Sequence, residues 1–329
     1  MVAREDILTL TSARFPHTAD SPAEVVALEK GGSDRNFHRI RNGEDSMIFV
    51  KYSDRKEENR HYVDIARFLA GVGVPVPGVF EHDPAEGLIW MQDMGEDDLW
   101  SHRNEPWSAR RPLYESTLDA VLAMHTSATR AVSGLDLHLE RVFDADLYRW
   151  EQGYFFDNCL GMHFGIDGAE LQTLRSLPAL NDAAEHLGSL PRVLVHRDFQ
   201  SQNVMIQHER AWLIDFQGMR FGLPQYDLAS LLHDPYVTLL EAEKAELLAY
   251  YKSRLAATGA AIPADFDTVF DWCSVQRLMQ ALGAYGFLGH QKGRADFLIH
   301  IPAARATLCR VASRLDGLQQ LVAKLQSLP

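Results

Sequence analysis

The chain has 329 residues, of which 46% are hydrophobic, so it is long enough to bury a sizeable core as one large domain or as two lobes. Its formal net charge of -13 argues against nonspecific binding to nucleic acid or anionic membranes, and no apolar run approaches the roughly 18 residues of a membrane-spanning helix. The N-terminus lacks the apolar run of a signal peptide, and the three widely spaced cysteines form neither a disulfide framework nor a zinc pattern, so we expect a cytoplasmic protein.

The first ninety or so residues are predicted to be mostly strand. The expected strands are residues 25–28, 37–41, 47–52 and 88–91. The Asn42-Gly43 dipeptide between the second and third of these is a strong hairpin signal. Residues 58–70 carry apolar side chains at helical spacing and predict one helix, and residues 92–95 are predicted to be a hinge.

From about residue 107 onward the pattern is mainly helical. Short apolar runs that suggest strands interrupt it at residues 193–195, 204–206 and 212–214. Residues 266–328 are again helical, with breaks expected at Gly286 to Gly289, at Gly293 and at Pro302.

These patterns together predict an α+β chain with two lobes. A small β-rich lobe is expected over residues 1–91, a hinge over 92–95, and a larger, mainly helical lobe over 96–329.

Three oxygen-bearing side chains, Asp198, Asn203 and Asp215, lie at the edges of the short apolar runs. Two strands and a tight connection would bring them together, and a cation would offset the cost of burying their charge. Mg²⁺ prefers oxygen ligands and often uses only one or two carboxylates, with phosphate and water completing its shell.

The spacing H-R-D-x-x-x-x-N followed by Asp-Phe is typical of a kinase catalytic loop and its metal-binding Asp. It predicts Asp198 as the base and Asn203 and Asp215 as metal ligands, with His196 orienting the loop. The alternative interpretation is a polar turn that caps two strands.

The N-terminal half supplies candidates for nucleotide binding. Glycines in the stretch Gly31, Gly32, Ser33 and Asp34 would let backbone N–H groups approach phosphates, although the same residues suit an ordinary turn. Gln92, Asp93 and Met94 are expected to offer backbone groups to the base.

Lys51 ends the apolar strand MIFVK, as the phosphate-pairing Lys of a kinase does, and the alternative is a solvated strand end. Glu58, at the start of the following helix, is the candidate to orient Lys51. Glu57 and Asp64 compete with it, and an exposed helix start explains Glu58 equally well.

The chain resembles the aminoglycoside phosphotransferase-like kinases, which share the protein-kinase fold. HRDFQSQNVMI matches their catalytic loop, and WLIDFQGMRFGLPQYDLASLL matches their metal-binding segment and the helix after it. The resemblance implies ATP and Mg²⁺ as cofactors, and a structural role for Asp227 in supporting the catalytic loop. Within the family, three stretches resemble those of bacterial cell-wall sugar kinases that phosphorylate the anomeric hydroxyl of N-acetylmuramate and N-acetylglucosamine. They are IDFQ followed by YDLASLLHDPY, RFLAGVGVPVPGV before the predicted hinge, and QRLMQALGAYGFLG near the C-terminus.

Two departures from protein kinases favour a small-molecule acceptor. Asp215 and Asp227 are twelve residues apart, which leaves no room for a long activation segment, and Gln200 stands where protein Ser/Thr kinases have Lys. The acceptor is expected on the helical lobe, facing Asp198. Its candidate contacts are Glu151, Tyr154, His233, Asp234, Gln276 and Arg277. For any single one of these, a place in the core or on a solvated helix face is favoured over a contact with the acceptor.

The negative net charge of the chain is also compatible with a second class of acceptor. Kinases for polycationic aminoglycosides line the acceptor site with carboxylates, which the stretch from Glu96 or the pair Asp144 and Asp146 would supply. Neutral hydrogen-bonding groups, with Arg277 for a lactyl carboxylate, would instead favour the muramyl sugar. Other small alcohols such as choline or homoserine, and a non-catalytic nucleotide-binding scaffold, are the remaining alternatives. Neither a nucleic-acid nor a membrane partner is expected, and no oligomeric state is predicted.

Overall fold

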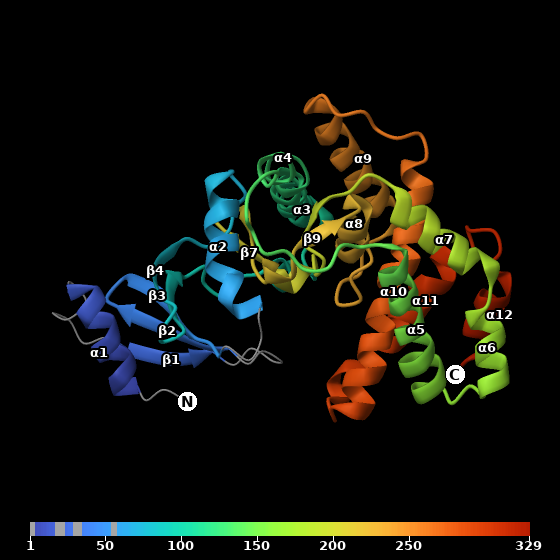
Figure 1. Cartoon of the computed structure of the whole chain (residues 1–329), viewed down its shortest axis with the longest axis horizontal. Helices are drawn as coiled ribbons and strands as arrows, with labels where there is room; N and C mark the ends of the chain where they lie inside the picture. Colours follow the sequence, from blue (N-terminus) through green and yellow to red (C-terminus); the bar gives the residue numbers. More distant parts are fainter. Residues whose placement is uncertain (1–3, 17–23, 29–34, 54–57) are drawn as a thin grey trace.

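The computed structural model describes residues 4–16, 24–28, 35–53 and 58–329, without the side chain of Glu58. Its chain forms a small β-rich lobe and a larger, mainly helical lobe, which lie side by side in Figure 1. This two-lobed α+β architecture confirms the predicted fold class.

The small lobe is built on a five-stranded antiparallel sheet with the order β1-β2-β3-β5-β4. Its strands are β1 (Glu24–Leu28), β2 (Asn36–Asn42), β3 (Asp45–Lys51), β4 (Val79–Asp83) and β5 (Leu88–Gln92). β2 and β3 pair through a tight turn in which Gly43 has a positive φ of 63°, so the predicted hairpin is confirmed. β4, which follows the proline-rich stretch, was not predicted.

The two faces of this sheet are covered by different helices (Figure 1). Ile48 and Val50 of β3 belong to the main core, into which α2 (Glu58–Gly71) packs. Phe49 points the opposite way because side chains alternate along a strand, and it meets Trp90 edge-on in a second cluster. The unpredicted helix α1 (Arg4–Arg14) closes that cluster, and the indole of Trp90 donates to the Thr11 hydroxyl.

The large lobe consists mostly of helices. The α-helices are α3 (Trp107–Ala123), α4 (Thr129–Ala131), α5 (Ala145–Phe155), α6 (Gly168–Arg175), α7 (Pro178–Ser189), α8 (Pro224–Leu232), α9 (Glu241–Ala257), α10 (Phe266–Gln291), α11 (Ile301–Ala312) and α12 (Gln319–Ser327). Two π-helical segments, η3 (Met124–Ala128) and η4 (Phe156–His163), extend α3 and α5. Short 3-10 turns cover η2 (Leu99–His102), η5 (Ser201–Asn203), η6 (Phe216–Gly218) and η7 (Ala295–His300).

Helix α10 continues through Gly286 to Gly289, so the break predicted there is wrong. A Cβ at Gly286 would lie 2.2 Å from the carbonyl oxygen of Asn158, and one at Gly283 would lie 2.8 Å from the Tyr154 ring. These glycines let α10 pack closely against α5 and η4. Tertiary packing therefore overrides the low helix propensity of glycine.

Two small two-stranded antiparallel sheets hold the residues of the site between the lobes. β6 (Val193–Val195) pairs with β9 (Arg220–Gly222), and β7 (Val204–Gln207) pairs with β8 (Arg210–Leu213). The interval from Asp215 to Asp227 is filled by η6, β9 and the start of α8. Each predicted apolar run in this region is a strand, with the last one displaced by one to two residues.

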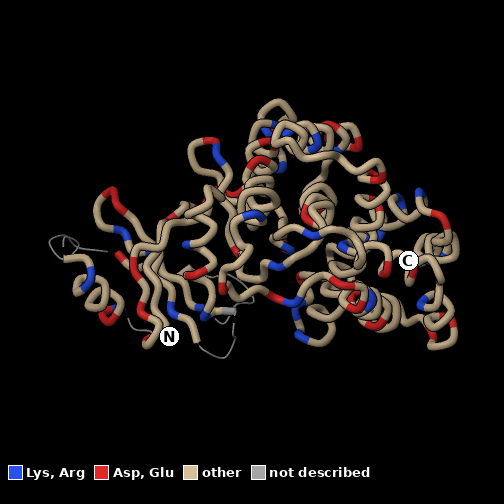
Figure 2. Tube along the Cα trace, turned by 45° about the horizontal axis from the view of Figure 1, so that its top comes forward, with Lys and Arg blue, Asp and Glu red and all other residues tan. Residues whose placement is uncertain are grey.

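Acidic and basic residues are interspersed over both lobes (Figure 2). In the part of the chain that the structure describes, no helix has both the length and the apolar character needed to cross a membrane.

Candidate active site

The loop between β6 and β7 is held in an unusual backbone conformation. Arg197 has a φ of 78°, in the left-handed region that residues with a Cβ rarely adopt. The carboxylate of Asp227 stabilises it by accepting hydrogen bonds from the backbone N–H groups of His196 at 2.7 Å and Arg197 at 2.8 Å. The loop is therefore fixed by a buried carboxylate on α8.

Two histidines complete this support. His125 Nε2 lies 3.0 Å from an Asp227 carboxylate oxygen, and its Nδ1 lies 2.7 Å from the Tyr251 hydroxyl. His196 Nε2 lies 2.9 Å from the carbonyl oxygen of Ile214, which ties the loop to the segment that carries Asp215. Both histidines are buried and act on the loop rather than in the cleft.

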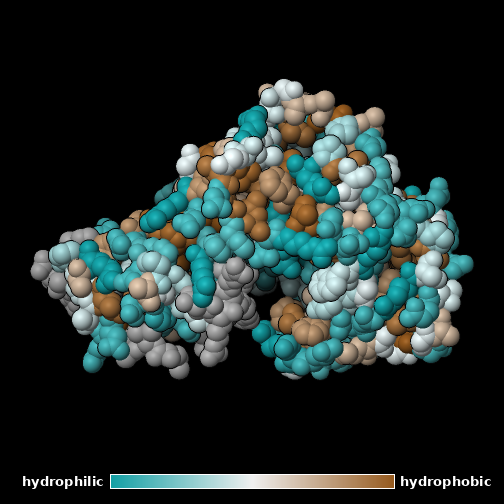
Figure 3. Space-filling view, in the orientation of Figure 1, coloured by the Kyte–Doolittle hydropathy of each residue, from teal (hydrophilic) through white to brown (hydrophobic). Residues whose placement is uncertain are grey.

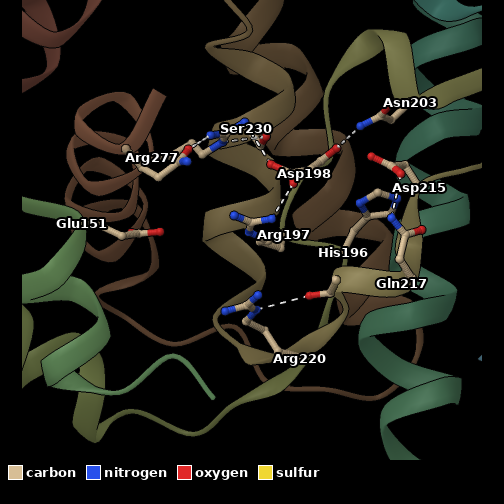
Figure 4. Close-up of polar contacts among 12 residues, drawn as sticks. Glu151, His196, Arg197, Asp198, Asn203, Asp215, Gln217, Arg220, Ser230 and Arg277 are labelled. Atoms are coloured by element: carbon tan, nitrogen blue, oxygen red, sulfur yellow. Dashed lines mark hydrogen bonds and ion pairs between the residues drawn. The ribbon is translucent and has the colours of Figure 1, made fainter. Parts of the chain in front are cut away.

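Asp198 projects between two guanidinium groups (Figure 4). Arg197 Nη1 donates to one carboxylate oxygen at 2.8 Å, and Arg277 Nη2 lies 3.6 Å from the other. Burial alone would raise the pKa of Asp198, but the charges of Arg197 and Arg277 hold it below its ordinary value. The carboxylate therefore stays ionised at neutral pH.

Asn203 and Asp215 face the same cleft as Asp198. The Asn203 side-chain amide donates to the Asp198 carbonyl oxygen at 2.9 Å, which fixes the orientation of its own oxygen. Asp215 has a left-handed φ of 63°, and its side chain is 41% exposed toward the cleft. The three predicted residues are thus brought together.

This donor set fits a magnesium ion that is shared with phosphates. In the part of the chain that the structure describes, no three His, Cys, Asp or Glu side chains form a metal cage. One amide oxygen and one carboxylate are the few protein ligands that Mg²⁺ uses when phosphate oxygens and water complete its shell.

The cleft itself has a volume of about 740 Å³ and lies between the lobes, where Figure 3 shows the surface hollowed. Its apolar and aromatic lining residues are Leu28, Phe37, Ile48, Tyr62, Pro77, Met91, Met94, Met205, Ile214, Leu288 and Phe297. A slot of this kind suits the flat face of a nucleobase, with the polar groups of the catalytic loop at its other end.

Residues 92–95, which the sequence predicts to be a hinge, are held in place by hydrogen bonds within the small lobe. The backbone N–H of Gln92 donates to Gly78 at 2.8 Å, and the Asp93 carboxylate accepts two hydrogen bonds from the guanidinium of Arg39. Gln92 and Met94 line the cleft, whereas the Asp93 side chain is buried against Arg39. Gly31, Gly32, Ser33, Asp34 and the side chain of Glu58 lie outside the described residues.

The geometry contradicts the prediction that Lys51 faces the phosphates. Val50 points into the main core, so alternation along β3 puts Lys51 on the opposite face with Phe49. Its ammonium group donates to the carbonyl oxygen of Glu86 in the turn between β4 and β5. The motif MIFVK has the right composition for a kinase strand, but its lysine is one residue out of register with the cleft face.

Glu151, on α5, lies near Arg197, Arg220 and Arg277 on the acceptor side of Asp198. One of its carboxylate oxygens accepts from the Tyr226 hydroxyl at 2.8 Å, and the other has no hydrogen-bond partner among the described residues. Burial raises the pKa of Glu151 to about 7, against the opposing effect of Tyr226 and of Arg197. Its side chain points toward Arg197 in Figure 4.

Two other acceptor candidates, Arg277 and Asp234, differ in what their side chains contact. Arg277 reaches Asp198, and its Nε donates to the Ser230 hydroxyl at 2.9 Å. Asp234 is turned inward and accepts hydrogen bonds from the Ser201 backbone at 2.8 Å and from the Ser201 hydroxyl. Asp234 thus supports the catalytic loop instead of facing a ligand.

None of the six acceptor candidates is among the described residues that line the cleft, and the remaining three pack within the large lobe. His233 stacks on Phe270, and burial lowers its pKa to about 3. Tyr154 stacks on Trp150 with ring centroids 5.1 Å apart. Gln276 is fully buried, and neither of its side-chain atoms has a hydrogen-bond partner among the described residues. The structure does not bring these three side chains to Asp198.

Two arginines that lie near the site were not predicted from the sequence. Arg35 lines the cleft, and its Nη2 lies 3.1 Å from an Asp215 carboxylate oxygen. Arg220, on β9, lies near Arg197 and Glu151 and is held by the carbonyl oxygens of Gly218 and Arg141. The position of Arg35 directly after the glycine-containing stretch could have indicated a role in the cleft. Nothing in the sequence around Arg220 indicates that it lies near the site.

The two lobes, the cleft and the Asp–Asn–Asp arrangement define a phosphotransferase of the protein-kinase-like fold. The sequence model of the phosphotransferase enzyme family matches residues 24–263, so the chain belongs to this family. The predicted resemblance is thereby confirmed.

Characterised relatives and solved structures agree with this assignment. The chain is 27% identical to an N-acetylmuramate/N-acetylglucosamine kinase of Pseudomonas aeruginosa over 312 residues, 94% of this chain and 89% of that protein. An enzyme of the same name from Pseudomonas putida is 26% identical over 92% of this chain and 88% of its own length.

Two solved structures share the fold at low sequence identity. A choline kinase from Cryptosporidium parvum superposes with a TM-score of 0.65 and 14% identity, over 99% of this chain and 100% of its own. An ADP-bound aminoglycoside phosphotransferase gives a TM-score of 0.62 and 13% identity, over 92% and 97%. The chain is a small-molecule kinase, as predicted.

Proposed function

We propose that this kinase transfers the γ-phosphoryl group of ATP, with Mg²⁺, to the anomeric hydroxyl of an N-acetylated amino sugar such as N-acetylmuramate or N-acetylglucosamine. The names of the relatives that match most of the chain support this acceptor class. Such a reaction would serve the recycling of cell-wall sugars.

The observation that carries the proposal is the charge around Asp198. Three guanidinium groups, those of Arg197, Arg220 and Arg277, gather on this side of the site, with Glu151 as the nearby carboxyl. A polycationic aminoglycoside would be repelled by such a cluster, whereas the lactyl carboxylate of N-acetylmuramate would be attracted.

The acidic residues that would favour an aminoglycoside are engaged elsewhere. Glu96 pairs with Arg39 at the hinge, and Asp98 caps η2. Asp144 caps α5 and accepts from Arg141, and Asp146 pairs with Arg149 on the same helix. None of these carboxylates belongs to the described lining of the cleft.

The ionised Asp198 would hold the acceptor hydroxyl by hydrogen bonding and accept its proton as the reaction proceeds. The acceptor oxygen then bonds to the γ-phosphorus, and the bond from that phosphorus to the β–γ bridging oxygen breaks, which releases ADP. Because Arg197 and Arg277 keep the pKa of Asp198 low, orientation of the hydroxyl contributes more than basicity in the ground state.

Asn203 and Asp215 would hold Mg²⁺, which neutralises charge on the nucleotide phosphates when bound. The Gln217 amide donates to Asp215 at 2.8 Å and would keep that carboxylate turned into the cleft. The apolar slot and the hinge would hold the base and align the γ-phosphate with the acceptor.

The test is ADP release from ATP·Mg²⁺ across six acceptors: N-acetylmuramate, N-acetylglucosamine, glucosamine, kanamycin, choline and homoserine. We expect turnover on the two N-acetyl sugars and an anomeric phosphate by NMR of the product. Turnover on kanamycin, choline or homoserine alone would refute the proposed acceptor class.

Arg277→Gln probes the carboxylate contact more directly. We expect KM for N-acetylmuramate to rise about tenfold more than KM for N-acetylglucosamine, since only the former offers a carboxylate to a charge-assisted hydrogen bond. Arg254→Gln, which removes an exposed arginine paired with Asp119, is the matched control. Equal effects on both sugars would remove Arg277 from acceptor selection.

A further inference from the structure

The orientation of Lys51 leaves open which side chain meets the nucleotide phosphates. Lys51 shares the outer face of β3 with Phe49 and contacts the turn at Glu86. Moving its ammonium group to the cleft would require a shift of β3 by one residue, which would also move Ile48 and Val50 out of the core. The register of the sheet therefore keeps Lys51 away from the cleft.

Arg35 occupies the position that a phosphate-binding cation needs. It lies directly before β2, and its side chain is 10% exposed within the cleft. Nη2 lies 3.1 Å from Asp215, and Nη1 lies 3.4 Å from the Gln217 side-chain oxygen. The guanidinium thus rests against the residue that would hold Mg²⁺ on the phosphates.

Two aromatic rings hold this guanidinium in place. The Cζ atom of Arg35 lies 5.5 Å from the centroid of the Phe37 ring and 5.7 Å from that of Tyr62, distances at which a cation is attracted to the ring face. Tyr62 belongs to α2 and stacks on Phe216, the residue after Asp215, with centroids 5.1 Å apart. Helix α2 therefore positions Arg35 through an aromatic face.

The other cationic side chains that line the described cleft have different partners. Arg39 is bound to Asp93 beneath the hinge, Arg197 is paired with Asp198, and Arg294 is paired with Asp296. Arg35 is the one paired with the candidate metal ligand, so binding of Mg²⁺ to Asp215 would redirect its guanidinium to a phosphate.

We infer that Arg35, rather than Lys51, is the side chain that binds the nucleotide phosphates in this kinase, with Phe37 and Tyr62 as positioning residues. This inference rests on the proposed use of a nucleoside triphosphate. The planar guanidinium suits the role because it binds two phosphate oxygens at once.

The experiment compares Arg35→Ala, Arg35→Lys and Lys51→Ala by calorimetric binding of ADP with Mg²⁺ and of adenosine, which carries no phosphate. For Arg35→Ala we expect the affinity for Mg²⁺·ADP to fall about ten- to a hundredfold, as for loss of a charge-assisted hydrogen bond, while adenosine affinity stays at the wild-type value. Lys51→Ala should bind both ligands as wild type does, and Arg35→Lys should lie between.

Unchanged adenosine binding shows that each variant retains a folded cleft. Wild-type affinity of Arg35→Ala for Mg²⁺·ADP, or an equal loss in Lys51→Ala, would overturn the inference. Failure of the wild-type chain itself to bind Mg²⁺·ADP would instead refute the proposed function.

Discussion

The carboxylate of Asp198 lies between two guanidinium groups, and this neighbourhood sets its protonation over the working pH range. Since its pKa is lowered, protonation removes the carboxylate only below the ordinary range of an Asp side chain. The activity should therefore show no loss attributable to Asp198 between neutral pH and about pH 5.

Asp198→Asn keeps the size of the side chain but removes its charge. We expect kcat to fall by roughly 10²- to 10⁴-fold, the usual contribution of a positioned base, with little change in affinity for Mg²⁺·ADP. Asp119→Asn, on the exposed face of α3, is the control and should behave as wild type. Turnover near the wild-type rate in Asp198→Asn would remove Asp198 from the reaction.

Glu151→Gln is expected to alter how stability depends on pH. The pKa of Glu151 is raised to about 7, so the folded chain retains a proton that the unfolded chain releases near pH 4.5. This contribution to stability is present below the unfolded pKa and is lost as the pH rises toward the folded pKa. Glutamine has no such dependence.

The unfolding free energy of Glu151→Gln minus that of the wild type should therefore increase with pH. The expected increase from about pH 4 to about pH 8 is up to about 3 kcal/mol. Urea unfolding of both proteins at the two pH values measures the difference. A difference that does not vary with pH would show that Glu151 titrates normally.

At the scale of elements, the close approach of α10 to η4 depends on Gly286. Alanine there would put a Cβ 2.2 Å from the backbone oxygen of Asn158, and backbone cannot move aside as a side chain can. We expect Gly286→Ala to lower the free energy of unfolding by about 2 kcal/mol, as overpacking does.

Gly153→Ala is the matched control, because Gly153 also lies within a helix but has open space around it. This variant should be stabilised by up to about 1 kcal/mol from helix propensity. Both substitutions replace a helical glycine by alanine. If both lowered the free energy of unfolding, the close contact between α10 and η4 would not be the cause of the loss.

Elements were easier to predict from the sequence than the directions of their side chains. The hairpin at Asn42-Gly43, helix α2 and the loop from His196 to Asn203 depend on local signals and were predicted near their observed bounds. Lys51 was misplaced because one residue of register reverses the face of a strand, and no local signal in MIFVK fixes that register.

The acceptor side was the least predictable part. Glu151, Arg220 and Arg277 come from α5, β9 and α10, which are far apart in the chain and meet only through tertiary packing. Sequence reasoning found two of these residues among six candidates, because a polar side chain on a helix gives no indication of which neighbour it will face.

At the scale of the whole molecule, Arg39 links the sheet of the small lobe to the hinge. Its side chain and that of Asp93 are 5% and 4% exposed, and Nε donates to the Asp93 carboxylate at 2.6 Å. Asp93→Ala would leave a buried guanidinium short of its main partner, so we expect a loss of about 3 kcal/mol in unfolding free energy and a higher KM for ATP.

Glu96→Ala removes the other carboxylate that pairs with Arg39, and its side chain is 76% exposed. This control should cost less than about 1 kcal/mol, because exposed ion pairs contribute little. Chemical unfolding and ATP titration of both variants measure the contrast. Similar losses in the two would show that burial does not determine the strength of this link.

The short interval between Asp215 and Asp227 has a consequence for control of the enzyme. These thirteen residues, all of them described, are folded into η6, β9 and the start of α8. They contain no free loop whose covalent modification would switch the catalytic residues between an assembled and a dismantled state. We therefore expect that this interval does not regulate the kinase in the manner of a protein-kinase activation segment.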